Sequence, residues 1–304
     1  VELPATKDAP GRVIKAPTLD GQGDEKGLRL ATFDKGVTFE ETPAATGQNK
    51  PSTRTATSRT LVLHLGGQLE NIEQAEFRQQ VVFVDGTVRG DGDLGTYDAR
   101  GKGKLTLKRG EGASARKPRV SDESFAVVAQ TIDVALDSHD MTGKGAVGTV
   151  TTPASKKPDE KKAPGLFDEG EPVRGFAADL VYTSETGRAV YTGAGKDQAE
   201  LRQTRSAGYI YADRIIVEDA TRNLDAKGNV SQQFRETPTK GADAGKKPSM
   251  TSVTAGSLVY DDAARTAVYV GTVKMKNVEG MTEGDKITLF LRKEDRSIQR
   301  LVVE

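Results

Sequence analysis

Apolar and polar residues alternate along much of this chain, and a period of two residues predicts β-strands rather than helices. Leu61, Leu63 and Leu65 show the alternation clearly, and the pair of glycines that follows indicates a turn. The best helical candidate is the segment 71–80, but the apolar run 81–84 follows it at once, so we predict a strand there as well. The pattern therefore predicts an all-β chain.

Four segments repeat one arrangement of apolar residues and a glycine. In each, two apolar residues two positions apart precede the glycine by 13 and 11 positions. The four copies are Ile132-x-Val134…Gly145, Leu180-x-Tyr182…Gly193, Ile215-x-Val217…Gly228 and Leu258-x-Tyr260…Gly271. Each copy predicts two strands and a turn, with the glycine allowing a sharp bend or bulge. One such hairpin cannot bury its apolar face alone, so we expect stacked copies that form an elongated, twisted antiparallel β-jelly roll.

The phase of the repeat predicts which side chains face the interior, because residues two apart in a strand point the same way. The candidates for the interior are Ile132, Val134, Leu180, Tyr182, Tyr191, Ile215, Val217, Leu258, Tyr260 and Tyr269. They form either an ordinary core or the wall of a groove that binds apolar ligands. The tyrosines favour a partly open interior, because a buried hydroxyl needs water or another polar partner.

The last strand of the sequence has no following copy with which to pair. The segment 284–289 restarts the unit, and the sequence then ends on Leu301, Val302, Val303 and Glu304. An unpaired edge strand is a template for the addition of a strand from another molecule. We therefore expect Leu301, Val302 and Val303 to form a docking edge.

Composition divides the chain into segments. Stretches rich in Pro, Gly, Asp and Lys predict an extended N-terminal segment over 1–27, with one strand indicated at 12–16, and a linker or insertion over 153–172. These leave a first β-domain over 28–152 and a second over 173–304, while 236–249 is a further polar insertion.

The charge balance and the absence of cysteine exclude several classes of protein. The 44 basic residues equal the 44 acidic ones, so the chain lacks the charge signature of a dedicated nucleic-acid binder. Without cysteine there are no disulfides and no thiolate ligands or nucleophiles. No apolar run reaches the roughly 18–20 residues that cross a bilayer as a helix. The chain begins with Val1 rather than Met, so we expect a leader or anchor to have preceded it.

Candidate catalytic and metal-binding residues are few. His64 is expected to point outward from an alternating strand and His139 to lie in a turn, with no partner group at a spacing that indicates catalysis. The sequence Asp91-Gly92-Asp93 is only part of a calcium-loop pattern, and there is no Gly-x-Ser-x-Gly. We therefore predict no catalytic residues, no metal site, no cofactor and no enzymatic activity.

Several strands resemble the OstA-like family of the lipopolysaccharide-transport bridge, of the LptA and LptC type. The carrying residues are Ala255-Gly256-Ser257-Leu258-Val259-Tyr260-Asp261, Ala267-Val268-Tyr269-Val270-Gly271-Thr272-Val273 and Glu283-Gly284-Asp285-Lys286-Ile287-Thr288-Leu289. The copies at 178–193 and 212–230 are similar, and the segment 58–107 looks more like the LptC-type pattern. The resemblance covers roughly residues 28–304, about twice the length of a minimal module, so the chain is either two fused jelly rolls or one elongated one.

The resemblance implies a periplasmic lipid carrier. It implies a twisted β-jelly roll that binds the acyl chains of lipopolysaccharide in a hydrophobic groove and joins other jelly rolls head to tail through edge strands. It leaves open an inner-membrane anchor ahead of residue 1. The alternative interpretation is a structural or adhesive β-solenoid with a sealed core and no lipid cargo. A carbohydrate-active β-helix is a weaker interpretation, because the chain has no tryptophan.

Overall fold

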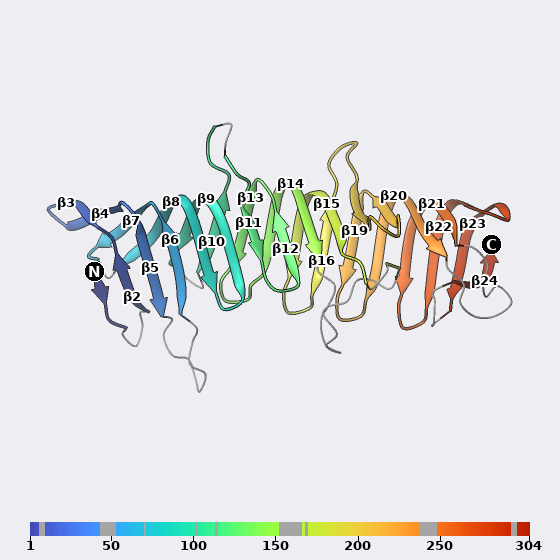
Figure 1. Cartoon of the computed structure of the whole chain (residues 1–304), viewed down its shortest axis with the longest axis horizontal. Coiled ribbons are helices and arrows are strands. Elements are labelled where there is room, and N and C mark those ends of the chain that lie inside the picture. The colour runs from blue at the N-terminus through green and yellow to red at the C-terminus, as the bar shows by residue number, and fades with distance from the viewer. Residues whose placement is uncertain are drawn as a thin grey trace. The chain divides into compact units, whose positions relative to one another are not determined.

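The computed structural model describes residues 1–5, 10–42, 53–69, 71–100, 103–112, 115–151, 166–167, 170–236, 248–292 and 297–304. Across these residues the chain is all-β, with antiparallel strands and no helix, as the sequence pattern predicts (Figure 1). The chain divides into two compact units, Val1–Lys144 and Gly145–Glu304. The parts of the predicted insertions at 153–165, 168–169 and 237–247 lie outside the described residues.

The strands of the first unit are β1 Glu2–Leu3, β2 Gly11–Lys15, β3 Thr18–Asp24, β4 Gly27–Asp34, β5 Val37–Thr42, β6 Arg54–Ser58, β7 Thr60–Gly67, β8 Ile72–Asp85, β9 Val88–Asp98, β10 Lys104–Lys108, β11 Arg119–Ser121, β12 Phe125–Val128 and β13 Thr131–Ala135. Strand β14, Met141–Thr151, spans the division between the units. The strands of the second unit are β15 Val173–Thr183, β16 Arg188–Thr192, β17 Ala199–Arg202, β18 Tyr209–Ala212, β19 Arg214–Glu218, β20 Asn223–Glu236, β21 Ser249–Asp261, β22 Thr266–Asn277, β23 Gly280–Leu291 and β24 Ile298–Val303.

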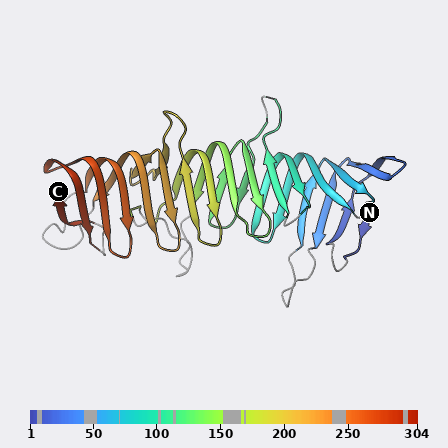
Figure 2. The same cartoon turned by 180° about the vertical axis from the view of Figure 1, so that it is seen from behind.

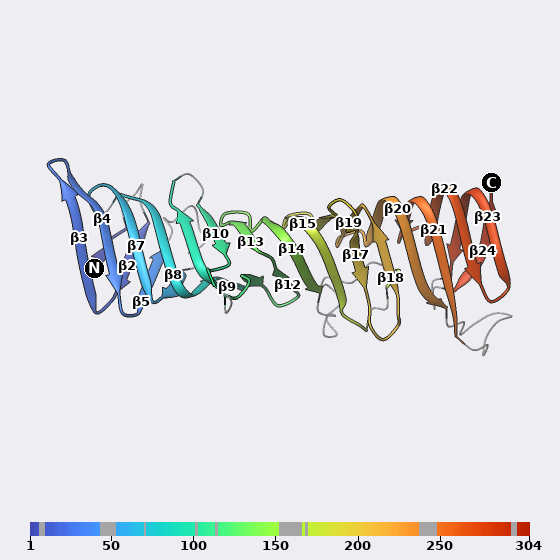
Figure 3. The ribbon, with the colours of Figure 1, turned by 90° about the horizontal axis from the view of Figure 1, so that it is seen from above.

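Each unit consists of two sheets that share their long strands. In the first unit, β8 pairs with β7 through residues 72–78 and with β6 through residues 82–84. In the second unit, β20 pairs with β19 through residues 223–227 and with β18 through residues 231–233. We call the sheet that contains β7 or β19 sheet I, and the sheet that contains β6 or β18 sheet II. Figure 2 shows these strands from behind, and Figure 3 shows β20 to β23 side by side from above.

The long strands pass from one sheet to the other through β-bulges. The register of β22 shifts between Val270 and Val273, where Gly271 and Thr272 have φ values of 90° and 47°. Gly145 and Gly228 also adopt positive φ, each followed by a second residue with positive φ. Glycine adopts this conformation without the steric cost that a β-carbon imposes. Three of the four repeat glycines therefore adopt the backbone conformation of a bulge, and the register shifts at Gly228 and Gly271 confirm a bulge at these two.

The fourth repeat glycine, Gly193, has a different role. It does not have a positive φ, and it follows the end of β16 at Thr192 instead of continuing a long strand. Its amide donates to the carbonyl of Asp213 at 2.9 Å, and a β-carbon at this position would lie 2.4 Å from the carbonyl oxygen of Asp197. Here glycine is needed for the close approach of two backbone segments.

The segment 1–27 contains more sheet than the single strand that the sequence indicates. Strand β2 pairs with β5, β3 pairs with β4, and β1 pairs with β2. Residues 72–80 of the segment 71–80 lie in β8, so the strand prediction there is confirmed. In each unit the core lies between the two sheets, where apolar side chains such as Phe39 and Phe77 meet edge to face with ring centroids 5.7 Å apart.

Candidate functional site

The ten residues predicted to face the interior are all buried, with exposed fractions of 0–7%. Ile132 and Val134 lie in β13 of the first unit, and the other eight lie in the second unit. In the second unit the strand registers align them in two neighbouring rows on the inner side of sheet I. The first row is Leu180, Tyr191, Ile215, Ala226, Leu258, Tyr269, Ile287 and Val303. The second is Tyr182, Ala189, Val217, Leu224, Tyr260, Ala267, Leu289 and Leu301. We call these the inner rows.

The inner rows include residues that the fixed spacing does not select. Leu224 and Ala226 lie in β20, which returns from the turn after β19, so the spacing measured from the first strand of each copy does not reach them. Leu289 belongs to the segment that restarts the unit, two positions after Ile287. The alternation within each return strand is the signal that would have found them.

The tyrosine hydroxyls of the inner rows bond to protein groups. Tyr269 donates to Oε1 of Gln232 at 2.6 Å, and the hydroxyl of Tyr191 lies 3.0 Å from Oγ1 of Thr149. Gln232 and Thr149 are themselves buried, with 1% and 3% of their surface exposed. These tyrosines therefore do not require the partly open interior that the sequence suggests, because protein partners meet their need for hydrogen bonds.

Burial also changes the acidity of these tyrosines. Loss of solvent raises the pKa of Tyr191 to about 12, because a phenolate would be poorly solvated there. Burial, together with the hydrogen bond to Asp262 at 2.8 Å, raises the pKa of Tyr260 to about 12. Burial raises the pKa of Tyr269 as well. All three hydroxyls remain protonated at neutral pH. Those of Tyr191 and Tyr269 bond to residues of other strands, and that of Tyr260 bonds to Asp262 just beyond its own strand.

The first unit contains a buried ion network that sequence reasoning missed. Its members are Arg12, Glu41, Arg54, Asp85 and His139. Arg12 Nε lies 2.9 Å from Glu41 Oε2, and Arg54 Nε lies 2.9 Å from Asp85 Oδ2. Arg12, Glu41, Arg54 and Asp85 share the inward phase of their strands with buried apolar neighbours, as Glu41 does with Phe39. His139 lies in a turn, and its side chain is 41% exposed. A charge at an inward position was the available signal, since a buried charge needs a partner.

The ion network joins the two sheets of the first unit. Arg54 donates through Nη2 to the carbonyl of Leu136 at 2.8 Å, and His139 Nε2 lies 3.4 Å from Asp85 Oδ2. Burial alone raises the pKa of Asp85, but the hydrogen bond from His139 and the charge of Arg54 outweigh it and lower the pKa. The same hydrogen bond raises the pKa of His139. His139 lies in the predicted turn and stabilises a contact between the sheets.

Strand β24 forms one edge of sheet I in the second unit. It pairs with β23, and among the described strands no other pairing of β24 occurs. Its residues Leu301 and Val303 end the two inner rows, and Val303 is 41% exposed although its partner Ile287 is fully buried. The amide of Glu304 donates to the carbonyl of Lys286, which places the amide of Val303 on the free side of the strand.

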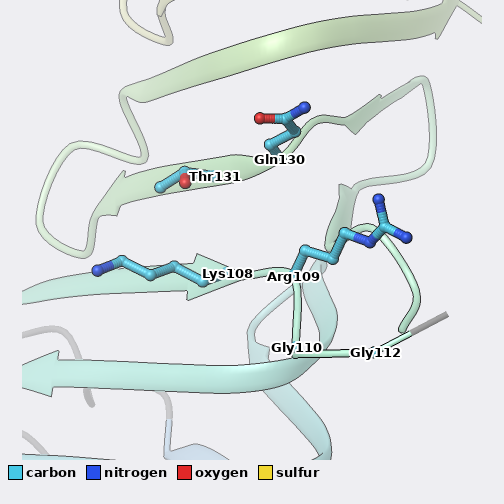
Figure 4. Close-up of a pocket in the computed structure, with 6 residues that line it drawn as sticks. All are labelled: Lys108, Arg109, Gly110, Gly112, Gln130 and Thr131. Carbon is cyan, nitrogen blue, oxygen red and sulfur yellow. The ribbon is translucent and has the colours of Figure 1, made fainter. Parts of the chain in front are cut away.

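Two described pockets lie away from the inner rows. The first, of about 460 Å³, is lined by Lys108, Arg109, Gly110, Gly112, Gln130 and Thr131 (Figure 4). The second, of about 390 Å³, is lined by Gln80, Val81, Val82, Asp91, Gly92, Arg116, Lys117 and Arg119. In Figure 4 the side chains come from two neighbouring segments and are polar or charged. Arg109 Nε donates to the carbonyl of Ala115 at 3.1 Å, so part of this group already serves the loop itself.

The described residues contain no group of three or more His, Asp or Glu side chains placed to hold a metal ion. His64 Nε2 lies 3.0 Å from Glu76 Oε1 in a half-exposed pair. Within the same residues there is no helix long and apolar enough to cross a membrane. No model of a known protein family matches the sequence, and no curated protein is similar enough to count as a relative.

Proposed function

We propose that this chain is a non-enzymatic periplasmic carrier that binds the acyl chains of a lipid, lipopolysaccharide or one like it, between the two sheets of its second unit. The observation that carries the proposal is that the inner rows end at an unpaired edge, where Leu301 and Val303 remain partly uncovered. A second jelly roll that adds a strand to β24 would extend both rows across the junction. The resemblance to the OstA-like family supports the choice of lipid.

The inner rows give a physical route for an acyl chain. An acyl chain that enters between the sheets breaks cross-sheet hydrogen bonds such as those of Tyr191 and Tyr269, and each loss costs about 1–3 kcal/mol because the polar groups stay buried. Each buried methylene contributes about 0.8 kcal/mol in return. A few methylenes therefore offset each lost bond, and because apolar burial is non-directional the chain can slide along the rows.

Photo-crosslinking tests this proposal. A photoreactive residue replaces Tyr182, Tyr260 or Tyr269, and the full chain is irradiated with lipopolysaccharide. The matched control replaces Arg188, which lies on the outer side of β16 and forms an exposed ion pair with Glu218. We expect lipid adducts at the three inner positions. Labelling no stronger than at Arg188 would contradict the proposal that acyl chains bind between the sheets.

A second function is favoured by a specific observation. All ten predicted interior residues are at most 7% exposed, and the hydroxyls of Tyr191, Tyr260 and Tyr269 have protein partners. This arrangement suits a structural or adhesive scaffold with a sealed core. The same crosslinking experiment separates the two functions, because a scaffold would give no adduct at any inner position while it still assembled through β24.

A further inference from the structure

The outer side of sheet I in the second unit carries a third row, which is mainly apolar. The registers align Val181, Val190, Ile216, Asp225, Val259, Val268, Thr288 and Val302 across β15, β16 and β19 to β24. We call this the outer apolar row. Val181 and Val259 are each 48% exposed, whereas Val190 in the same row is 8% exposed and already covered. Outward positions of a sheet are normally polar when that face meets only solvent.

The equivalent row of the first unit shows that the fold does not require apolar residues there. Its members are Asp20, Thr32, Val62, Glu76, Thr96, Thr106, Asp133 and Thr142. It spans eight strands in the same register, and only Val62 is apolar. Six of the eight residues in the outer apolar row are Val or Ile. A general preference of strands for β-branched residues is met equally by threonine, so it does not explain the difference.

Mainly polar rows, each with one apolar member (Phe290 or Val270), border the outer apolar row on both sides. Toward the β15–β16 turn lie Thr183, Arg188, Glu218, Asn223, Asp261, Thr266, Phe290 and Arg300. On the other side lie Asp179, Thr192, Arg214, Lys227, Ser257, Val270, Lys286 and Glu304. No strand carries the same charge in both of these rows, and β19 and β24 carry opposite charges.

We propose that this face binds the same face of a second copy of the chain, in a dimer whose two-fold axis runs along the outer apolar row. With this axis, each strand of one copy faces the same strand of the second copy. Each of the two bordering rows faces the other bordering row of the second copy. Glu218 of one copy then meets Arg214 of the second, and Arg300 meets Glu304. The strands of sheet I in one copy then run nearly along those of sheet I in the second copy, as in aligned sheet packing.

The size of the face fits a stable dimer. Eight strands about 4.8 Å apart and three rows about 7 Å apart cover about 700 Å² with the outer halves of the side chains included. Specific interfaces bury about 800 Å² per partner. An isologous contact also closes after two copies. It uses the outward side chains of the sheet and leaves the unpaired backbone edge of β24 free, so it is independent of end-to-end joining and of any lipid.

Single cysteines test the dimer directly, because the natural chain has none. Along the two-fold axis each position of the outer apolar row faces itself. Val181→Cys and Val259→Cys are therefore expected to form disulfide-linked dimers under mild oxidation. Thr96→Cys, in the equivalent row of the first unit, is the matched control and is expected to give no disulfide-linked dimer, because this row lies outside the proposed interface. Both valines are half-exposed, so the substitutions leave the core intact.

Sedimentation equilibrium gives the second measurement. The double variant Val181→Asp, Val259→Asp is expected to weaken the dimer at least about a hundredfold, because it brings like charges together. Glu218→Arg is expected to weaken it and Glu218→Arg with Arg214→Glu to restore it. A wild-type chain that remains monomeric at about 100 μM without cysteine cross-links overturns the proposal. A monomer that binds phospholipid vesicles through Val181 and Val259 overturns it as well, in favour of a lipid surface.

Discussion

Removal of one hydroxyl from the interior distinguishes a dry core from a water-filled groove. Tyr269→Phe leaves Oε1 of Gln232 without its 2.6 Å partner in a site that is 1% exposed. A buried acceptor that loses its partner costs about 1–3 kcal/mol. In a groove filled with water, a solvent molecule would replace the hydroxyl, and the loss would fall below about 0.5 kcal/mol.

Hydrogen exchange of the β20–β22 peptides, followed by mass spectrometry, reports this free energy locally. A local probe is used because the chain has two compact units, and a single global transition does not define one free energy of unfolding for such a chain. The double variant Tyr269→Phe, Gln232→Leu replaces both partners by apolar groups and is expected to recover most of the loss. Tyr211→Phe is the control, since its hydroxyl bonds to Glu200 in a less buried site. A loss below about 0.5 kcal/mol in Tyr269→Phe would refute the description of a sealed interior.

Four further predictions follow from the described contacts. The hydrogen bond to Asp85 raises the pKa of His139, so the stabilisation by this bond is complete below the ordinary pKa of 6.5 and is lost as the pH rises through the raised pKa. His139→Gln should flatten this part of the curve of stability against pH. Tyr191 and Tyr260, with their pKa values raised to about 12, should show no phenolate absorbance at pH 10.5 in difference spectra against their Phe variants. The stabilisation of the fold by these two protonated hydroxyls should be lost between pH 10 and 12. Gly271→Ala should lower the local free energy of unfolding by about 1–2 kcal/mol, measured by hydrogen exchange of the β22 peptides, because φ is 90° at this position. Val303→Pro removes an amide from the free side of β24 and should abolish end-to-end assembly in light scattering, and an unchanged assembly would exclude this edge.

The repeat in the sequence predicted the phase of the strands because phase depends on local alternation. All ten predicted interior residues are buried, and three of the four repeat glycines adopt the positive φ of a bulge. Gly193 shows the limit of the pattern. The same spacing there reflects the approach of Asp197, a contact that depends on the path of the chain after β16.

The polar contacts between sheets could not be predicted from spacing. Glu41 and Tyr97 lie 56 positions apart, and their hydrogen bond of 2.9 Å requires two sheets to face each other. The same is true of Tyr269 and Gln232, 37 positions apart. The sequence indicates that each inward polar group needs a partner, but only the pairing of the strands identifies it.

The affinity for lipids of increasing acyl length tests the proposed carrier most directly. If acyl chains are buried between the sheets of the second unit, each added methylene contributes about 0.8 kcal/mol and tightens binding about fourfold. Isothermal titration of the full chain with a series of single-chain lipids of one headgroup measures this slope. We expect the affinity to rise steadily with acyl length until the acyl chain is longer than the inner rows. An affinity that does not change with acyl length would contradict the proposed carrier.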